Sequence, residues 1–159
     1  MANRLLGGTG RDVLIGNGGN DVLDGGAGLK LLATKVSGTI ERAGQVAGLA
    51  EPANQLAAAL QKLGAATKAA WASGVPEEAL ANATPYLQAF GHVVLAWIWL
   101  DVALAATALP EAQATRREGK RAAMRCFFAY ELPRVDAWLA VVAAREAVGR
   151  TVDEAMLRA

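Results

Sequence analysis

One apolar stretch, Tyr86–Leu109, most constrains what this 159-residue chain can fold into. At helical spacing, one face of the stretch carries Phe90, Val93, Val94, Trp97, Leu104 and Ala108, and the opposite face carries Leu95, Ala96, Trp99, Val102, Ala103 and Ala106. A helix that is apolar all round is either buried on every side or spans a membrane.

The side chains within this stretch argue against a membrane span. Asp101 lies in the middle of the run, and a carboxylate at the centre of a membrane helix costs about 3 kcal/mol on insertion scales. The uninterrupted apolar core, Val93–Leu100, is far shorter than the roughly 20 residues that a span needs. We therefore predict no membrane span and place this helix at the centre of a soluble bundle.

The apolar spacing from Leu29 onward predicts helices in the rest of the chain. The predicted helices cover 29–46, 52–71, 76–109 and 111–131, with the last one continuing past a proline toward Val148. Pro85 and Pro133 should kink or divide the third and fourth helices, because proline removes a backbone hydrogen bond. Thr151 to Glu154 has the spacing of a capping box for a short last helix. The predicted fold class is all-α: an up-down four-helix bundle with a short C-terminal helix, preceded by a short Gly-rich segment that is a candidate partial β-roll.

Two long words within the helical part resemble a known family. NATPYLQAFGHVVLAWIWL (Asn82–Leu100) and GKRAAMRCFFAYELPRVDAWL (Gly119–Leu139) are similar to the C-terminal extension of bacterial acyl-CoA dehydrogenases of the 3-methylmercaptopropionyl-CoA dehydrogenase type. The resemblance covers about Asp24 to the C-terminus.

This resemblance implies a flavoenzyme context. Members of the family use FAD and a catalytic glutamate to remove two hydrogens from an acyl-CoA thioester, as an oxidoreductase of fatty acid metabolism. The resemblance does not reach the family's catalytic or FAD-binding parts, so no residue is carried over as catalytic or cofactor-binding. It implies an accessory or assembly domain that is inactive as an isolated chain. Its expected partner is a dehydrogenase domain or another subunit, a homo-oligomer included, and its expected location is the cytoplasm.

Before the helices, glycines recur with a period of nine. Residues 7–15 read GGTGRDVLI, residues 16–24 read GNGGNDVLD and residues 25–33 read GGAGLKLLA. This pattern resembles the calcium-binding nonapeptide repeat of RTX proteins, in which carbonyl and Asp oxygens bind Ca²⁺. The implied ligands are Asp12 and Asp21, and we place the boundary between this segment and the helical part at 27/28, giving 1–27 and 28–159.

Two readings of this segment stay open. Asp12 and Asp21 come from adjacent repeats, and Lys30 replaces the carboxylate in the third, so a Gly-rich leader is the favoured reading. The third repeat then belongs to the first helix. The alternative is a calcium-binding RTX-type module fused to a helical interaction domain, which would point to secretion.

Composition adds two exclusions. The formal net charge is +1, which gives no strong attraction to nucleic acid. The single cysteine, Cys126, can form no intrachain disulfide, and its lack of a neighbouring base predicts a structural thiol.

Three other polar features of the helical part are candidates for chemistry. His92 is the only histidine and is predicted to be a hydrogen-bonded core or interface residue. Asp101 is predicted to be buried and to pair with Lys120, Arg121 or Arg125, because a buried carboxylate requires a partner. Arg117, Arg121 and Arg125 form a basic line, predicted to be a solvated face, with a protein partner as the alternative. Nucleic acid is disfavoured, because no aromatic residues lie between these arginines.

Overall fold

The computed structural model describes residues 4–5, 22–23 and 25–158, and it divides the chain into two units, 1–36 and 37–159. In chain order the elements are β1 (Arg4–Leu5), β2 (Val22–Leu23), α1 (Gly25–Gly44), α2 (Ala50–Ala70), α3 (Pro76–Ala79), α4 (Ala83–Ala105), two 3-10 turns (Ala106–Ala108 and Glu111–Gln113), α5 (Ala114–Tyr130), α6 (Arg134–Ala144), α7 (Val148–Thr151) and α8 (Glu154–Leu157).

The N-terminal unit contains one parallel strand pair and the start of α1. Each strand is two residues long, and Arg4 pairs with Val22 and Leu5 with Leu23. Helix α1 begins at Gly25, so residues 25–33, the third nonapeptide, lie in the first turns of this helix. This confirms the interpretation that the third repeat belongs to the helical part.

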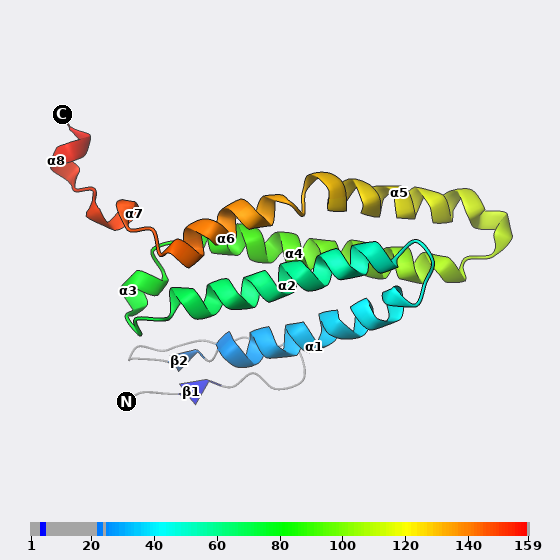
Figure 1. Ribbon diagram of the computed structural model, residues 1–159, viewed down its shortest axis with the longest axis horizontal. Coiled ribbons are helices and arrows are strands. Elements are labelled where there is room, and N and C mark those ends of the chain that lie inside the picture. The colour runs from blue at the N-terminus through cyan, green and yellow to red at the C-terminus, as the bar shows by residue number, and fades with distance from the viewer. Residues whose placement is uncertain (1–3, 6–21, 24, 159) are drawn as a thin grey trace. The chain divides into compact units, whose positions relative to one another are not determined.

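The second unit is a bundle of long helices that run up and down (Figure 1). Helices α2 and α4 pack against each other, α6 packs against both, and α5 packs mainly against α4. Helices α5 and α6 together form the last long rod, and residues 37–44 of α1 belong to this unit as well. The predicted all-α bundle is confirmed.

Helix α2 shows why this part of the sequence folds as it does. Its buried side chains recur every three or four residues, so they lie on one stripe: Ala53, Leu56, Ala59, Leu63, Ala66 and Ala70. Four of these six are alanines, which lets neighbouring helix backbones approach closely. Gly48 before the helix and Gly74 after it have positive φ values of 83° and 70°, a conformation that glycine adopts without steric cost.

The proline breaks occur close to where the sequence predicted them. The third helix is divided, and Pro85 lies in the first turn of α4, where its missing N–H removes no helical hydrogen bond. The fourth helix ends at Tyr130 and resumes as α6 after Pro133, so the expected kink is a complete break.

The C-terminal end differs from prediction in detail. The short last helix exists as α8, but its N-cap is Asp153, whose carboxylate accepts a hydrogen bond from the Met156 N–H at 3.1 Å. The predicted capping box from Thr151 is therefore wrong, because Thr151 instead ends the additional short helix α7.

Candidate interaction surface on helix α4

Helix α4 has one buried face and one exposed face, although both are apolar. Ala89, Val93, Ala96, Leu100 and Ala103 are buried. On the other side, Leu87 is 64% exposed, Leu95 is 44% exposed and Ile98 is 46% exposed. The predicted place of this helix within the bundle holds for one face only, because the described residues leave the other side of the helix exposed.

The exposed side forms a continuous surface without charge. We define the α4 stripe as Leu87, Gly91, Leu95, Ile98, Val102 and Ala105, which recur at three- or four-residue steps along the helix. Gly91 and Val102 are partly exposed, and a Cβ atom added at Gly91 would meet nothing within 4 Å. Exposed apolar surface gathered in this way is typical of interaction sites.

One edge of the α4 stripe is joined to α1 by a polar network. The buried Thr39 hydroxyl accepts a hydrogen bond from Trp97 Nε1 at 2.9 Å and donates to Asp101 Oδ1 at 3.3 Å. Arg42 Nη2 lies 3.3 Å from the same Asp101 oxygen. The predicted pairing of Asp101 with α5 is therefore wrong. The carboxylate is also 52% exposed instead of buried, since it lies at the rim of the stripe.

The opposite edge carries His92 and faces α5 and α6. His92 Nδ1 donates to the Gln88 carbonyl at 2.9 Å, which places the Nε2 atom 3.4 Å from Glu131 Oε2. The imidazole ring packs edge-on against the Trp138 ring, with 4.7 Å between centroids, and lies 5.9 Å from the Phe127 ring. The predicted hydrogen bonding of His92 is confirmed, and its contacts lie between helices of this chain.

The basic line on α5 is only partly a solvated face. The Arg117 side chain is 23% exposed and reaches Glu111 Oε2 at 3.1 Å, while Arg121 is 24% exposed and lies 3.8 Å from Glu118. Arg125 is exposed. The line therefore splits into two arginines that pack partly against the bundle and one that faces solvent.

Cys126 is exposed on α5. The prediction of a structural thiol is wrong, because the side chain points away from the face that carries the buried Met124 and Phe128.

A second cluster ties α3 to the end of α6. Glu78 Oε2 pairs with Arg145, and Glu78 Oε1 lies 3.9 Å from Arg150. Hydrogen bonds from the Ser73 hydroxyl and the Arg145 guanidinium, with the charges of Arg145 and Arg150, hold the pKa of Glu78 below its usual 4.5. Arg145 itself has φ 54°, a left-handed conformation that ends α6.

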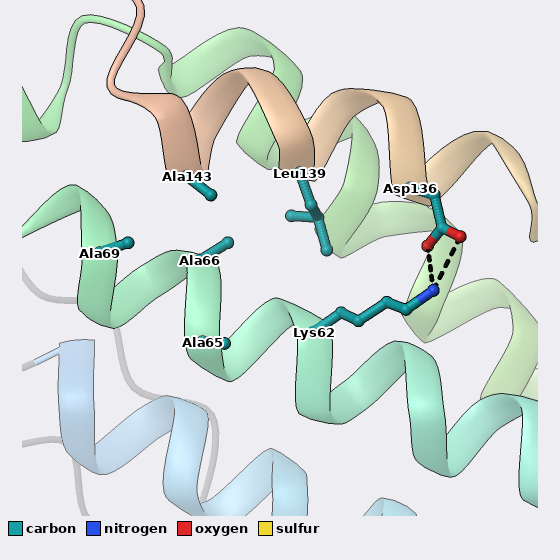
Figure 2. A pocket seen from close by; sticks show the side chains of 7 residues that line it. All are labelled: Lys62, Ala65, Ala66, Ala69, Asp136, Leu139 and Ala143. Atoms are coloured by element: carbon teal, nitrogen blue, oxygen red, sulfur yellow. Dashed lines mark hydrogen bonds and ion pairs between the residues drawn. The ribbon is translucent and has the colours of Figure 1, made fainter.

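A shallow groove of about 420 Å³ lies between α2 and α6 (Figure 2). Alanines and Leu139 line it, and at one end Lys62 Nζ bonds both carboxylate oxygens of Asp136 at 2.7 Å. A flavin needs donors and acceptors for its ring and its phosphates, and this lining offers only side chains that already bond each other. The groove does not fit FAD.

The described part of the chain brings too few metal-ligating side chains together to form a metal site. Within it, no three His, Cys, Asp or Glu side chains group closely enough to hold an ion. Asp12 and Asp21 lie outside the described residues.

One helix of the described residues, Ala83–Ala108, is long and apolar enough by length and composition to cross a membrane. The core helix of a soluble bundle meets the same criterion.

Comparisons with known proteins match the Gly-rich segment and the helical part to two different families. The family model described as "Acetyl-CoA dehydrogenase C-terminal like" matches residues 32–149. The model described as "RTX calcium-binding nonapeptide repeat (4 copies)" matches residues 1–28. No curated protein and no solved structure gives a significant match.

Proposed function

Because the chain belongs to the acyl-CoA dehydrogenase C-terminal-like family, we propose that it is an accessory, assembly-type helical domain of a flavoenzyme that dehydrogenates acyl-CoA. In this proposal the flavin and the catalytic carboxylate come from a dehydrogenase domain or subunit to which the bundle attaches. FAD held by that domain or subunit would supply the hydride acceptor for the dehydrogenation. The same proposal includes the branch of the family that the two words resemble, the 3-methylmercaptopropionyl-CoA dehydrogenases.

The α4 stripe is the observation that carries this proposal. It is a charge-free apolar surface on the central helix of the family domain, and burying it against a partner would remove its aliphatic side chains from water. The carboxylate in the α2/α6 groove, Asp136, is already paired with Lys62, and the described residues bring no three metal-ligating side chains together, so we assign the stripe to attachment and not to chemistry.

The test is complex formation with a FAD-loaded acyl-CoA dehydrogenase encoded by the same genome. We expect size-exclusion chromatography with light scattering to detect a complex with the wild-type chain, and to lose it for Leu95→Gln combined with Ile98→Gln. The matched control is Leu80→Gln combined with Leu157→Gln, which removes two apolar side chains that are even more exposed and lie away from the stripe. Equal binding by both double variants, or no complex with the wild-type chain, would contradict the proposal.

A second candidate function is supported by the family match at residues 1–28. RTX repeats bind calcium and often accompany secretion, so the N-terminal segment is a candidate calcium module carried with a helical interaction domain. Calcium titration separates this candidate from a Gly-rich leader.

A further inference from the structure

The surface next to the α4 stripe carries a strong local charge. Helix α5 contains five basic side chains and one acidic one, whereas the chain as a whole has a net charge of only +1. Arg116, Lys120 and Arg125 are exposed, and none of the three forms a salt bridge with a carboxylate of the described residues. Exposed cations without a carboxylate partner are available to an anionic partner.

Two of these cations lie on the edge of α5 that faces the α4 stripe. Phe127 marks this edge, since its ring lies beside the His92 ring of α4. Steps of three and four residues back from Phe127 reach Ala123, Lys120 and Arg116, which therefore share its face. Helices α4 and α5 run antiparallel (Figure 1), so these cations flank the part of the stripe that follows His92, toward Ile98 and Val102.

The other edge of the stripe carries no such excess. There Asp101 pairs with Arg42 at 3.3 Å, and the two charges cancel. The stripe is thus bordered by cations along α5 and by a neutral ion pair along α1.

This asymmetry specifies the partner. We propose that the α4 stripe receives a protein surface that has an apolar helical ridge and a row of carboxylates along one side, the side that meets Arg116 and Lys120. The proposal rests on the proposed function and names the chemistry of the docking partner. Burial of the ridge supplies attraction, and the row of carboxylates sets the orientation and speeds encounter.

Two other occupants match this surface less well. An anionic membrane would meet both edges at once, and the half-exposed Asp101 carboxylate would face lipid phosphates on the α1 side. A second copy of this chain brings the same basic α5 edge to the interface and supplies no row of carboxylates to meet Arg116 and Lys120.

The experiment measures binding of the whole chain to two designed helical peptides by fluorescence anisotropy. Both have roughly 24 residues, enough to span α4, and share one leucine and alanine ridge. One peptide carries glutamates along a single side of the ridge and the other carries lysines. Vesicles of phosphatidylcholine with and without phosphatidylglycerol, and sedimentation of the chain alone, test the other two occupants.

We expect the glutamate peptide to bind roughly tenfold more tightly than the lysine peptide at low salt, as a few exposed ion pairs allow. The difference should shrink as salt screens the charges. Arg116→Glu combined with Lys120→Glu should reverse the preference. The matched control, Arg125→Glu combined with Lys68→Glu, changes the charge equally at exposed positions away from this edge and should keep the original preference.

The outcomes separate this inference from the proposed function. Equal binding of both peptides, abolished by Leu95→Gln with Ile98→Gln, would overturn the charged partner and leave apolar docking standing. Binding to anionic vesicles alone, self-association that masks the stripe, or no binding of either peptide would overturn the inference, while the dehydrogenase complex decides the proposed function independently.

Discussion

At the scale of single residues, the buried Thr39 hydroxyl links three polar side chains of α1 and α4. Thr39 is 2% exposed, and its hydroxyl group contacts Trp97, Asp101 and Arg42. The hydroxyl is the only acceptor found for the Trp97 indole N–H within the described residues. Removing it leaves a partly buried donor without a partner, which costs more than the loss of an average hydrogen bond.

We therefore expect Thr39→Val to destabilise the bundle by about 1–2 kcal/mol, since valine keeps the shape and removes the acceptor. Urea denaturation followed by circular dichroism measures the change. Thr34→Val is the control, because the exposed Thr34 hydroxyl donates to the Lys30 carbonyl of its own helix, and the expected change there is within about 0.5 kcal/mol. Equal effects of the two substitutions would contradict the role given to Thr39.

The Glu78 cluster gives a prediction in acid. The folded state holds the pKa of Glu78 below its usual 4.5, chiefly through the Ser73 hydroxyl and Arg145, so folding favours the charged carboxylate. This stabilisation is fully present above pH 4.5 and is lost as the pH falls through the lower folded-state pKa.

We expect Glu78→Gln to lower the melting temperature at neutral pH and to flatten its fall below pH 4.5. Melting curves across this range, compared with those of the exposed neighbour variant Glu77→Gln, measure the difference. Parallel acid profiles of the wild-type chain and Glu78→Gln would show that Glu78 does not contribute.

At the scale of elements, α4 shows that equally hydrophobic residues of one helix can differ widely in burial. Leu100 and Ile98 are two residues apart in the same apolar run, yet Leu100 is fully buried and Ile98 is 46% exposed. The bundle supplies neighbours to one face of the helix only, so equal hydrophobicity gives unequal packing energy.

Leu100→Ala should therefore destabilise the chain by about 2–5 kcal/mol, because it opens a cavity in the core. Ile98→Ala should change the free energy of unfolding by less than about 1 kcal/mol, since the side chain is half exposed and alanine favours helix. Chemical denaturation of the two variants measures the contrast. A large loss for Ile98→Ala would mean that the stripe is covered within this chain.

At the scale of the whole molecule, the question is what the N-terminal segment adds to the bundle. Its first two repeats carry Asp12 and Asp21, and the third repeat lies in α1 with Lys30 exposed. A repeat architecture requires about three units to bury a continuous core. The helical start of the third unit leaves two.

We expect calorimetric titration with calcium to give no saturable heat in the micromolar range, either for the whole chain or for a shortened chain that starts at Gly28. This result would support a Gly-rich leader. Heat seen only with the whole chain, and lost in Asp12→Asn with Asp21→Asn, would establish the calcium module and reverse our reading.

The sequence alone determined the fold class and the positions of the breaks. These predictions use local features: the helical periodicity in α2, the prolines at 85 and 133, and the two long words that match the family. Such features can be recognised without knowledge of tertiary contacts. The sequence also identified α4 as the central helix, which packs against α2, α5 and α6.

Only the tertiary structure decided which side of α4 is covered and which groups meet across helices. Asp101 pairs with Arg42, which lies 59 positions away. From the sequence alone, cations on α5 such as Lys120 and Arg121 were equally plausible partners. Pairing depends on which helix lies beside which edge, and an all-round apolar helix gives no pattern from which to choose its buried side. Both the α4 stripe and the basic edge beside it follow from that choice.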